Sequence, residues 1–151
     1  MMDTQSESEK LNPDGILMLR TMSMPKDANP NGDIFGGWIM SQMDTAGAIM
    51  AYEMSRGRVV TVAVEKIVFR APVYVGDVVC CYCRCVHIGT TSITIKLDLW
   101  ARKNSSQKIS RIKVTEANFT YVAVDLEGKK RRLPDYIINN KDAIVAKGWI
   151  D

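Results

Sequence analysis

The stretch that most constrains the fold is a run of mostly apolar residues, Asn29 to Tyr52, which opens with turn-forming residues. After a pair of glycines, Gly47 is the only helix breaker in it, and apolar residues recur at helical spacing along one face. The remaining faces are scarcely polar, and a helix that is apolar nearly all round is buried. We therefore predict a buried helix over residues 37–55, ended by Gly57 with Arg56 in its last turn.

Two polar features of this stretch indicate chemistry. Asp44 lies in the middle of the helix among apolar and small neighbours, and a buried carboxylate is costly unless it has a partner or a task. It is either a structural carboxylate paired with an arginine or a backbone donor, or a functional group. Gly36 and Gly37 fall at the helix start, where unpaired N–H groups suit a developing oxyanion and the missing Cβ atoms admit a ligand. N–H donors followed by a carboxylate about two turns along predict a site that attacks a carbonyl.

Most of the remaining chain is predicted to form strands, because β-branched, apolar segments alternate with turn-forming residues. The predicted strands cover residues 16–22, 58–69, 78–88, 91–102 and 112–124. In the fourth strand apolar and polar residues alternate, so one face is buried and the other, which carries Trp100, is wet or at an interface. A helix this apolar needs a sheet to wrap it. The predicted fold class is α+β, with a long central helix wrapped by a five- to six-stranded antiparallel sheet.

The composition limits the classes of protein to which the chain can belong. With 151 residues, 46% of them hydrophobic, residues 1–151 fit one domain with a real core. Residues 1–12 are polar and acidic, unlike a secretory signal, and we expect a flexible tail there and a helical C-terminal extension over residues 135–151. The longest apolar run is too short for a membrane span, so we expect a cytoplasmic protein. A net charge of +3 does not argue for nucleic-acid binding, and the basic segment Lys129–Arg132 is either a solvated loop or attracts an anionic ligand.

Four cysteines near one histidine raise the question of a metal site. Cys80, Cys81, Cys83, Cys85 and His87 all fall in one predicted strand. Alternate residues of a strand lie about 6.5–7 Å apart on one face, which does not suit three ligands of one tetrahedral metal. Strand neighbours point to opposite faces, which also excludes a disulfide between them. We therefore predict no metal site and interpret the cysteines as small buried residues.

An ordered set of segments resembles the hotdog-fold acyl-CoA thioesterases, in particular the small bacterial YciA type. The first is D-A-N-P-N-G-D-I-F-G-G-W-I-M-S-Q-M-D, residues 27–44. The others are G-R-V-V-T-V (57–62), V-G-D-V-V-C-C-Y (75–82), G-T-T-S (89–92) and T-E-A-N-F-T-Y-V-A-V-D (115–125). The resemblance covers residues 16–134. It implies a hotdog fold and hydrolysis of acyl-CoA to a free acid and coenzyme A, with no cofactor because coenzyme A is part of the substrate and product.

The resemblance also implies roles for single residues. Asp44 occupies the place of the catalytic acid, as general base for water or as direct nucleophile on the thioester carbonyl. Asn29, which by itself is explained as a turn former, matches the asparagine that orients water or the thioester, and Gly36 and Gly37 match the oxyanion donors. The implied contacts to coenzyme A are Arg58, Thr61, Gly89, Thr90 and Thr91. The family's basic residue near position 63 is replaced by Ala63, for which Lys66 can compensate.

The resemblance further implies a homodimer with shared sites, assembled as a homohexamer of three dimers. The exposed sheet edge of a hotdog protomer and the Trp100 face agree with such contacts. A hydratase or dehydratase of the same fold relies on a histidine near the helix, and the only histidine here, His87, lies in a predicted strand. A non-enzymatic acyl-CoA-binding regulatory module stays open as an alternative, although it has no need of Asp44.

Overall fold

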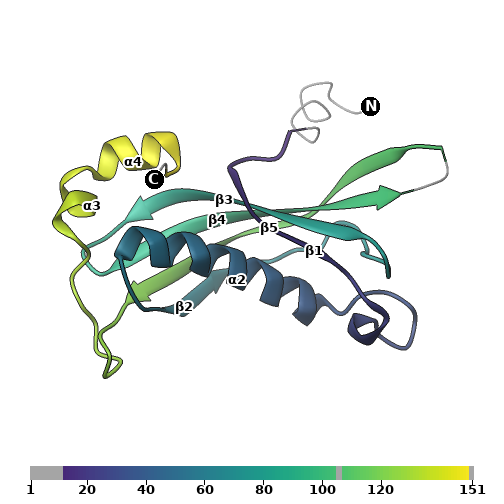
Figure 1. The fold of residues 1–151 in the computed structure, drawn as a ribbon, viewed down its shortest axis with the longest axis horizontal. Coiled ribbons are helices and arrows are strands. Elements are labelled where there is room, and N and C mark those ends of the chain that lie inside the picture. The colour runs from purple at the N-terminus through teal and green to yellow at the C-terminus, as the bar shows by residue number, and fades with distance from the viewer. Residues whose placement is uncertain (1–11, 105–106, 150–151) are drawn as a thin grey trace.

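One antiparallel sheet carries a long helix on one face in the computed structural model, which describes residues 12–104 and 107–149 (Figure 1). The elements are β1 (Ile16–Met22), the 3-10 helix η1 (Pro25–Asp27), α2 (Gly36–Ser55), β2 (Val59–Glu65), β3 (Val78–Ile88), β4 (Ser92–Asn104), β5 (Ile109–Ala123), α3 (Asp135–Asn139) and α4 (Lys141–Lys147). The predicted tail, residues 1–12, lies outside the described residues except for its last residue.

The five strands lie in the order β1-β3-β4-β5-β2, and every neighbouring pair is antiparallel. Strands β3, β4 and β5 follow one another as hairpins in the middle of the sheet, whereas β1 and β2 form its two edges. Since β1 precedes and β2 follows α2 in the chain, the helix crosses the whole sheet and contacts all five strands. The predicted α+β fold, with one helix against an antiparallel sheet, is confirmed.

The core lies between α2 and the sheet. The helix residues buried there are Ile39, Met43, Ala46, Gly47, Met50, Ala51, Met54 and Ser55. The opposite face of α2 exposes 38% of Met40, 36% of Ile49 and 58% of Tyr52. The predicted buried helix thus packs one face into the core, whereas its other face stays partly exposed in a single protomer, because one sheet covers only one side of a helix.

Two predicted boundaries are also wrong. The helix is ended by Arg56, which takes the left-handed conformation at φ 59°, and not by Gly57. Gly57 serves packing instead, since a Cβ there would lie 2.8 Å from Nη2 of Arg131. Strand β2 stops at Glu65 rather than near residue 69, because Lys66 turns the chain with φ 34°.

The prediction that Trp100 is wet or at an interface is wrong as well. Its side chain is only 2% exposed in the single chain, so no second dimer is needed to cover it. The strict alternation assumed for β4 is interrupted, because the register with β5 shifts between Leu99 and Trp100. A bulge of this kind changes the direction in which the following side chains point.

The cysteines are buried, as predicted. All four are free thiols, and three of them, Cys81, Cys83 and Cys85, belong to the core beneath α2. Burial raises the pKa of Cys81 to about 12 and that of Cys85 to about 11, so these thiols stay protonated and unreactive near neutral pH. Within the described ranges, no group of three or more histidine, cysteine, aspartate and glutamate side chains is placed to hold a metal ion. None of the helices in these ranges has the length and apolar character to cross a membrane.

Candidate active site

Two hydroxyl groups hold the Asp44 side chain halfway along α2. The Thr61 hydroxyl donates to Asp44 Oδ1 at 2.6 Å, and the Tyr121 hydroxyl lies 3.1 Å from the same oxygen and 2.9 Å from the Asp44 carbonyl oxygen. Thr61 and Tyr121 are direct neighbours across β2 and β5, so the strand register brings both hydroxyls to one point. Asp44 is half-buried, and its partners among the described residues are these hydroxyls and no cation. The alternative interpretation, a structural carboxylate paired with an arginine, therefore finds no such pair among the described residues of the protomer.

Tyr121 was not predicted from the sequence. It is 1% exposed, and a Cβ on Gly47 would lie 2.2 Å from its hydroxyl oxygen. Burial, followed by the nearby Asp44 carboxylate, raises the pKa of Tyr121 far above its ordinary value, so the phenol stays a hydrogen-bond donor. The available signal was Gly47, because an interior glycine in a helix often leaves room for a neighbouring group.

The start of α2 offers free N–H groups, as predicted. The Trp38 and Ile39 amides both donate to the Phe35 carbonyl oxygen, at 3.1 and 3.3 Å. The Gly36 and Gly37 amides have no acceptor among the described residues. A Cβ on Gly37 would meet nothing within 4 Å, so the space beside this residue is open in the protomer.

The helix start and Asp44 do not form one site within a single chain. Gly37 and Asp44 are seven positions apart, and at about 1.5 Å of rise per residue their backbones are separated by about 10 Å. A thioester carbonyl needs its oxyanion donors about 3 Å from its oxygen and the attacking group close to its carbon. Within one protomer the two predicted parts of the site therefore lie apart, one at the start and one in the middle of α2, and we call each of them a half-site.

Asn29 lies in the loop that leads into α2, and thus in the first half-site. Its Oδ1 accepts hydrogen bonds from the Asn31 and Asp33 amides at 2.9 and 3.2 Å, which fixes the turn. Its Nδ2 has no partner among the described residues and is a free donor. The turn-forming and the functional interpretation of Asn29 are thus compatible, since they use different atoms of its carboxamide.

Most residues predicted to contact coenzyme A lie together at the end of the sheet where α2 stops. They are Arg58, Gly89, Thr90 and Thr91. The Ala123 amide donates to the Thr91 carbonyl at 2.9 Å, and the next amide, that of Val124, donates to the Arg58 carbonyl at 3.0 Å. The end of β5 thus joins the two segments. Thr61 lies apart from this group, beside Asp44.

The basic segment Lys129–Arg132 reaches the same end of the sheet, because the Leu133 amide donates to the Thr90 carbonyl at 2.9 Å. Its members differ in role. The Arg131 guanidinium donates hydrogen bonds to the backbone carbonyls of Val124, Ser55 and Arg58, so its donors are already paired within the protein. The Lys130 side chain has no partner among the described residues, whereas Arg132 pairs with Asp135. Lys130 is accordingly the member most available to an anionic ligand.

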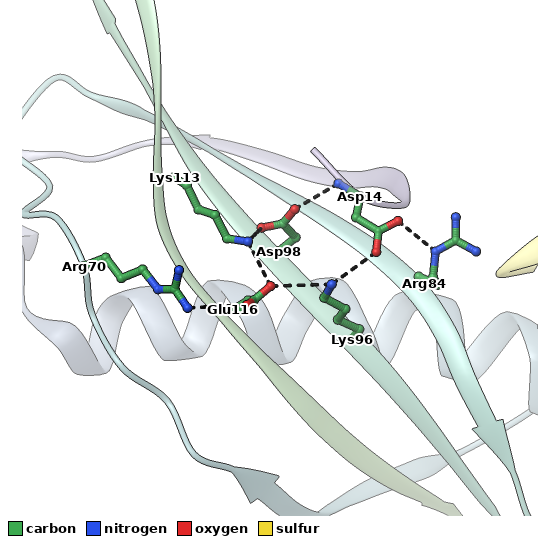
Figure 2. A network of polar contacts seen from close by, with 7 residues as sticks. All are labelled: Asp14, Arg70, Arg84, Lys96, Asp98, Lys113 and Glu116. Atoms are coloured by element: carbon green, nitrogen blue, oxygen red, sulfur yellow. Dashed lines mark hydrogen bonds and ion pairs between the residues drawn. The ribbon is translucent and has the colours of Figure 1, made fainter. Parts of the chain in front are cut away.

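A large cluster of charges lies away from Asp44, on the face of the sheet opposite α2 (Figure 2). It joins Asp14, Arg70, Arg84, Lys96, Asp98, Lys113 and Glu116. Burial opposes ionisation of Asp14, but hydrogen bonds from Arg84 and Lys96 hold its pKa below the ordinary value. An open cleft of about 380 Å³ on this face is lined partly by Lys66, together with Lys96 and Glu116 of the cluster. Because each carboxylate in the cluster has a cationic partner, we interpret it as structural.

Comparisons with known proteins show the family of the chain. The family model described as the thioesterase superfamily matches residues 31–107. The Acyl-CoA thioester hydrolase YciA of Escherichia coli (strain K12) is 62% identical over 123 residues, which are 81% of this chain and 93% of that protein. An uncharacterized acyl-CoA thioester hydrolase of Haemophilus influenzae is 58% identical over 121 residues, 80% of this chain and 79% of that protein.

Solved structures extend the likeness to three dimensions. HI0827, described as a hexameric broad specificity acyl-coenzyme A thioesterase, superposes with a TM-score of 0.81 at 52% identity, covering 89% of this chain and 92% of its own. The hexameric thioesterase y2039 from Yersinia pestis gives a TM-score of 0.79 at 58% identity, and the match covers 82% of this chain and 100% of y2039.

Proposed function

This chain belongs to the thioesterase superfamily, and from that premise we infer that it is an acyl-CoA thioester hydrolase, which converts an acyl-CoA to a free carboxylic acid and coenzyme A. The observation that carries the assignment is the carboxylate of Asp44, fixed on a half-buried helix by two hydroxyls in a chain 62% identical to a named hydrolase. A module that only binds acyl-CoA has no use for such a carboxylate.

We propose that Asp44 provides the reacting carboxylate in one of two ways. As a general base it takes a proton from water while the water oxygen attacks the thioester carbonyl carbon and the carbon–sulfur bond breaks. As a nucleophile it attacks that carbon itself, expels the thiolate and forms an anhydride that water then hydrolyses. Neither route needs a cofactor, because coenzyme A is part of the substrate and leaves as the thiol.

The oxyanion donors in this proposal come from the partner chain. The Gly36 and Gly37 amides are free but lie about 10 Å from Asp44 along α2, and Asn29, with its free Nδ2, lies in the loop before the helix. A second protomer with its helix start beside Asp44 completes the site, and the exposed outer face of α2 is the surface available for this contact. Two relatives of known structure, HI0827 and y2039, are described as hexameric. We therefore propose a homodimer with two shared sites, assembled as a trimer of dimers.

We place the coenzyme A portion of the substrate at the end of the sheet formed by Arg58 and the G-T-T-S turn at residues 89–92. Free hydroxyls and backbone N–H groups of a tight turn suit phosphate oxygens, and the nearby Lys129 and Lys130 give this end a positive charge. Thr61 is assigned to the Asp44 half-site instead, since its hydroxyl is already bonded to that carboxylate.

The test is a hydrolysis panel from acetyl-CoA to palmitoyl-CoA in which the released thiol is measured. We expect release by the wild type, and at least about a 100-fold lower kcat for Asp44→Asn with retained binding of coenzyme A. Glu53→Gln, an exposed change on the same helix, serves as the matched control and should keep full activity. Binding without thiol release by the wild type would instead establish a regulatory module, and near wild-type turnover of Asp44→Asn would remove this carboxylate from the mechanism.

A further inference from the structure

We propose that Tyr121 is a positioning residue for this hydrolysis, and that it fixes which oxygen of Asp44 reacts. Both hydroxyls at the site meet Oδ1, that of Thr61 at 2.6 Å and that of Tyr121 at 3.1 Å. Oδ2 has no hydrogen-bond partner among the described residues. Oδ2 is therefore the atom that meets the water or the thioester carbonyl, while Oδ1 is the anchor. The inference rests on the proposed function.

The anchor matters because the carboxylate of an aspartate is poorly fixed by its own side chain. Rotation of the terminal group is broad, without the three narrow wells of an ordinary side-chain torsion. Thr61 alone restrains one oxygen from one side. Tyr121 adds a second hydroxyl, 3.1 Å from Oδ1 and 2.9 Å from the Asp44 carbonyl oxygen, so its one hydrogen is shared between the side chain and the backbone of the residue it orients. A reacting group held in this way keeps its attack geometry.

The Tyr121 hydroxyl can act as a reference point because it is itself immobile. The ring is 1% exposed and lies beside the ring of Phe119, with centroids 6.4 Å apart and planes at 21°. It also fills the space left by Gly47, where a Cβ would come within 2.2 Å of the hydroxyl oxygen, 2.9 Å of Cζ and 3.0 Å of Cε2. Glycine at position 47 thus lets the phenol approach the helix closely enough to reach Asp44.

The matched experiment removes this hydroxyl and keeps the ring. We expect Tyr121→Phe to lower kcat about tenfold, the scale of one lost hydrogen bond to a charged group, while KM changes by less than about twofold. Tyr136→Phe removes an exposed hydroxyl on α3 and should leave both constants unchanged. Gly47→Ala keeps the hydroxyl but displaces it, and should lower kcat at least as much as Tyr121→Phe.

Four results separate the explanations. Loss of kcat with KM, oligomeric state and coenzyme A binding preserved supports positioning. A Tyr121→Phe variant that keeps wild-type kcat on an active wild-type background overturns the inference and leaves the proposed function standing. A fall in coenzyme A affinity or in assembly that matches the fall in kcat shows a merely structural role for the ring and also overturns it. A wild type that hydrolyses no acyl-CoA in the panel overturns the proposed function first.

Discussion

Replacing Arg131 with Met tests whether the basic segment near the end of β5 is built for stability or for ligand binding. The guanidinium of Arg131 donates to the Val124 and Ser55 carbonyls at 2.9 Å and to the Arg58 carbonyl at 3.2 Å. It enters through the space beside Gly57. One side chain therefore joins the end of α2, the start of β2 and the end of β5. Methionine keeps much of the apolar stem and removes every donor.

The expected loss of stability follows from these bonds. A hydrogen bond to a charged donor contributes about 1.5–3 kcal/mol, but the contributions of one half-exposed group are not additive. Ser55 is 0% exposed, and its carbonyl is one of the last four of α2, which lack a partner inside the helix. Leaving it unsatisfied adds to the cost. We expect a decrease of about 3 kcal/mol in the free energy of unfolding, equal to a decrease of about 6–12 °C in Tm for a chain of this size.

The assay is thermal and urea unfolding without ligand, at one protein concentration because assembly shifts Tm. Lys130→Met is the matched control. It also removes one positive charge, but the Lys130 side chain, unlike that of its neighbour Arg131, has no partner among the described residues. Its Tm should change by no more than about 2 °C. An unchanged Tm for Arg131→Met, combined with a raised KM for acyl-CoA, would refute the reasoning and make Arg131 a phosphate ligand.

Three further predictions concern catalysis, assembly and acid stability. Gly37→Val should abolish most hydrolysis without unfolding the protein, because its side chain enters the open space beside the oxyanion donors; unchanged kcat would show that the glycine serves packing alone. Unfolding and refolding a mixture of Asn29→Ala and Asp44→Ala should restore about one quarter of wild-type activity if two chains share each site, and no recovery despite confirmed subunit exchange would place both residues in one chain. A hydrogen bond from Lys113 holds the pKa of Glu116 below its ordinary 4.5, so its stabilisation is complete above that pH and is lost as the pH falls. Glu116→Gln should therefore have a lower free energy of unfolding than the wild type at neutral pH. Between about pH 5 and pH 3 its free energy of unfolding should fall less than that of the wild type, and an equal fall in both proteins would contradict the assignment.

The parts of the fold that follow from local patterning could be predicted from the sequence. Strands β1 and β3 begin and end at the predicted residues, since their apolar runs are bounded by turn formers. The end of β2 could not be predicted, because Ile67, Val68 and Phe69 after it are also strand-forming residues and the turn at Lys66 depends on a positive φ that its residue type disfavours. The end of α2 could not be predicted for the same reason, because Arg56 takes the left-handed conformation that glycine favours, although Gly57 follows it.

The candidate site shows a similar division. Asp44 and the glycine pair could be found from the sequence, because a carboxylate in an apolar helix and bare amides at its start are unusual in themselves. Tyr121 could not, since its contact with Asp44 joins residues 77 positions apart and depends on which strand lies under the middle of the helix. The separation of Gly37 from Asp44 was predictable from the rise of a helix, and it is the reason that we propose a second chain for the site.

The order of the strands determines when the sheet can be completed during synthesis of the chain. The edge strand β1 pairs only with β3, and the edge strand β2 only with β5, the last strand to be made. At about 5–20 residues per second, the roughly 70 residues between the end of α2 and the end of β5 take about 3–14 s to emerge from the ribosome. For that time the methionines of α2 have no complete sheet to cover them. We therefore expect a newborn chain to expose the apolar face of α2 during that interval, when exposed apolar surface favours aggregation or binding by chaperones.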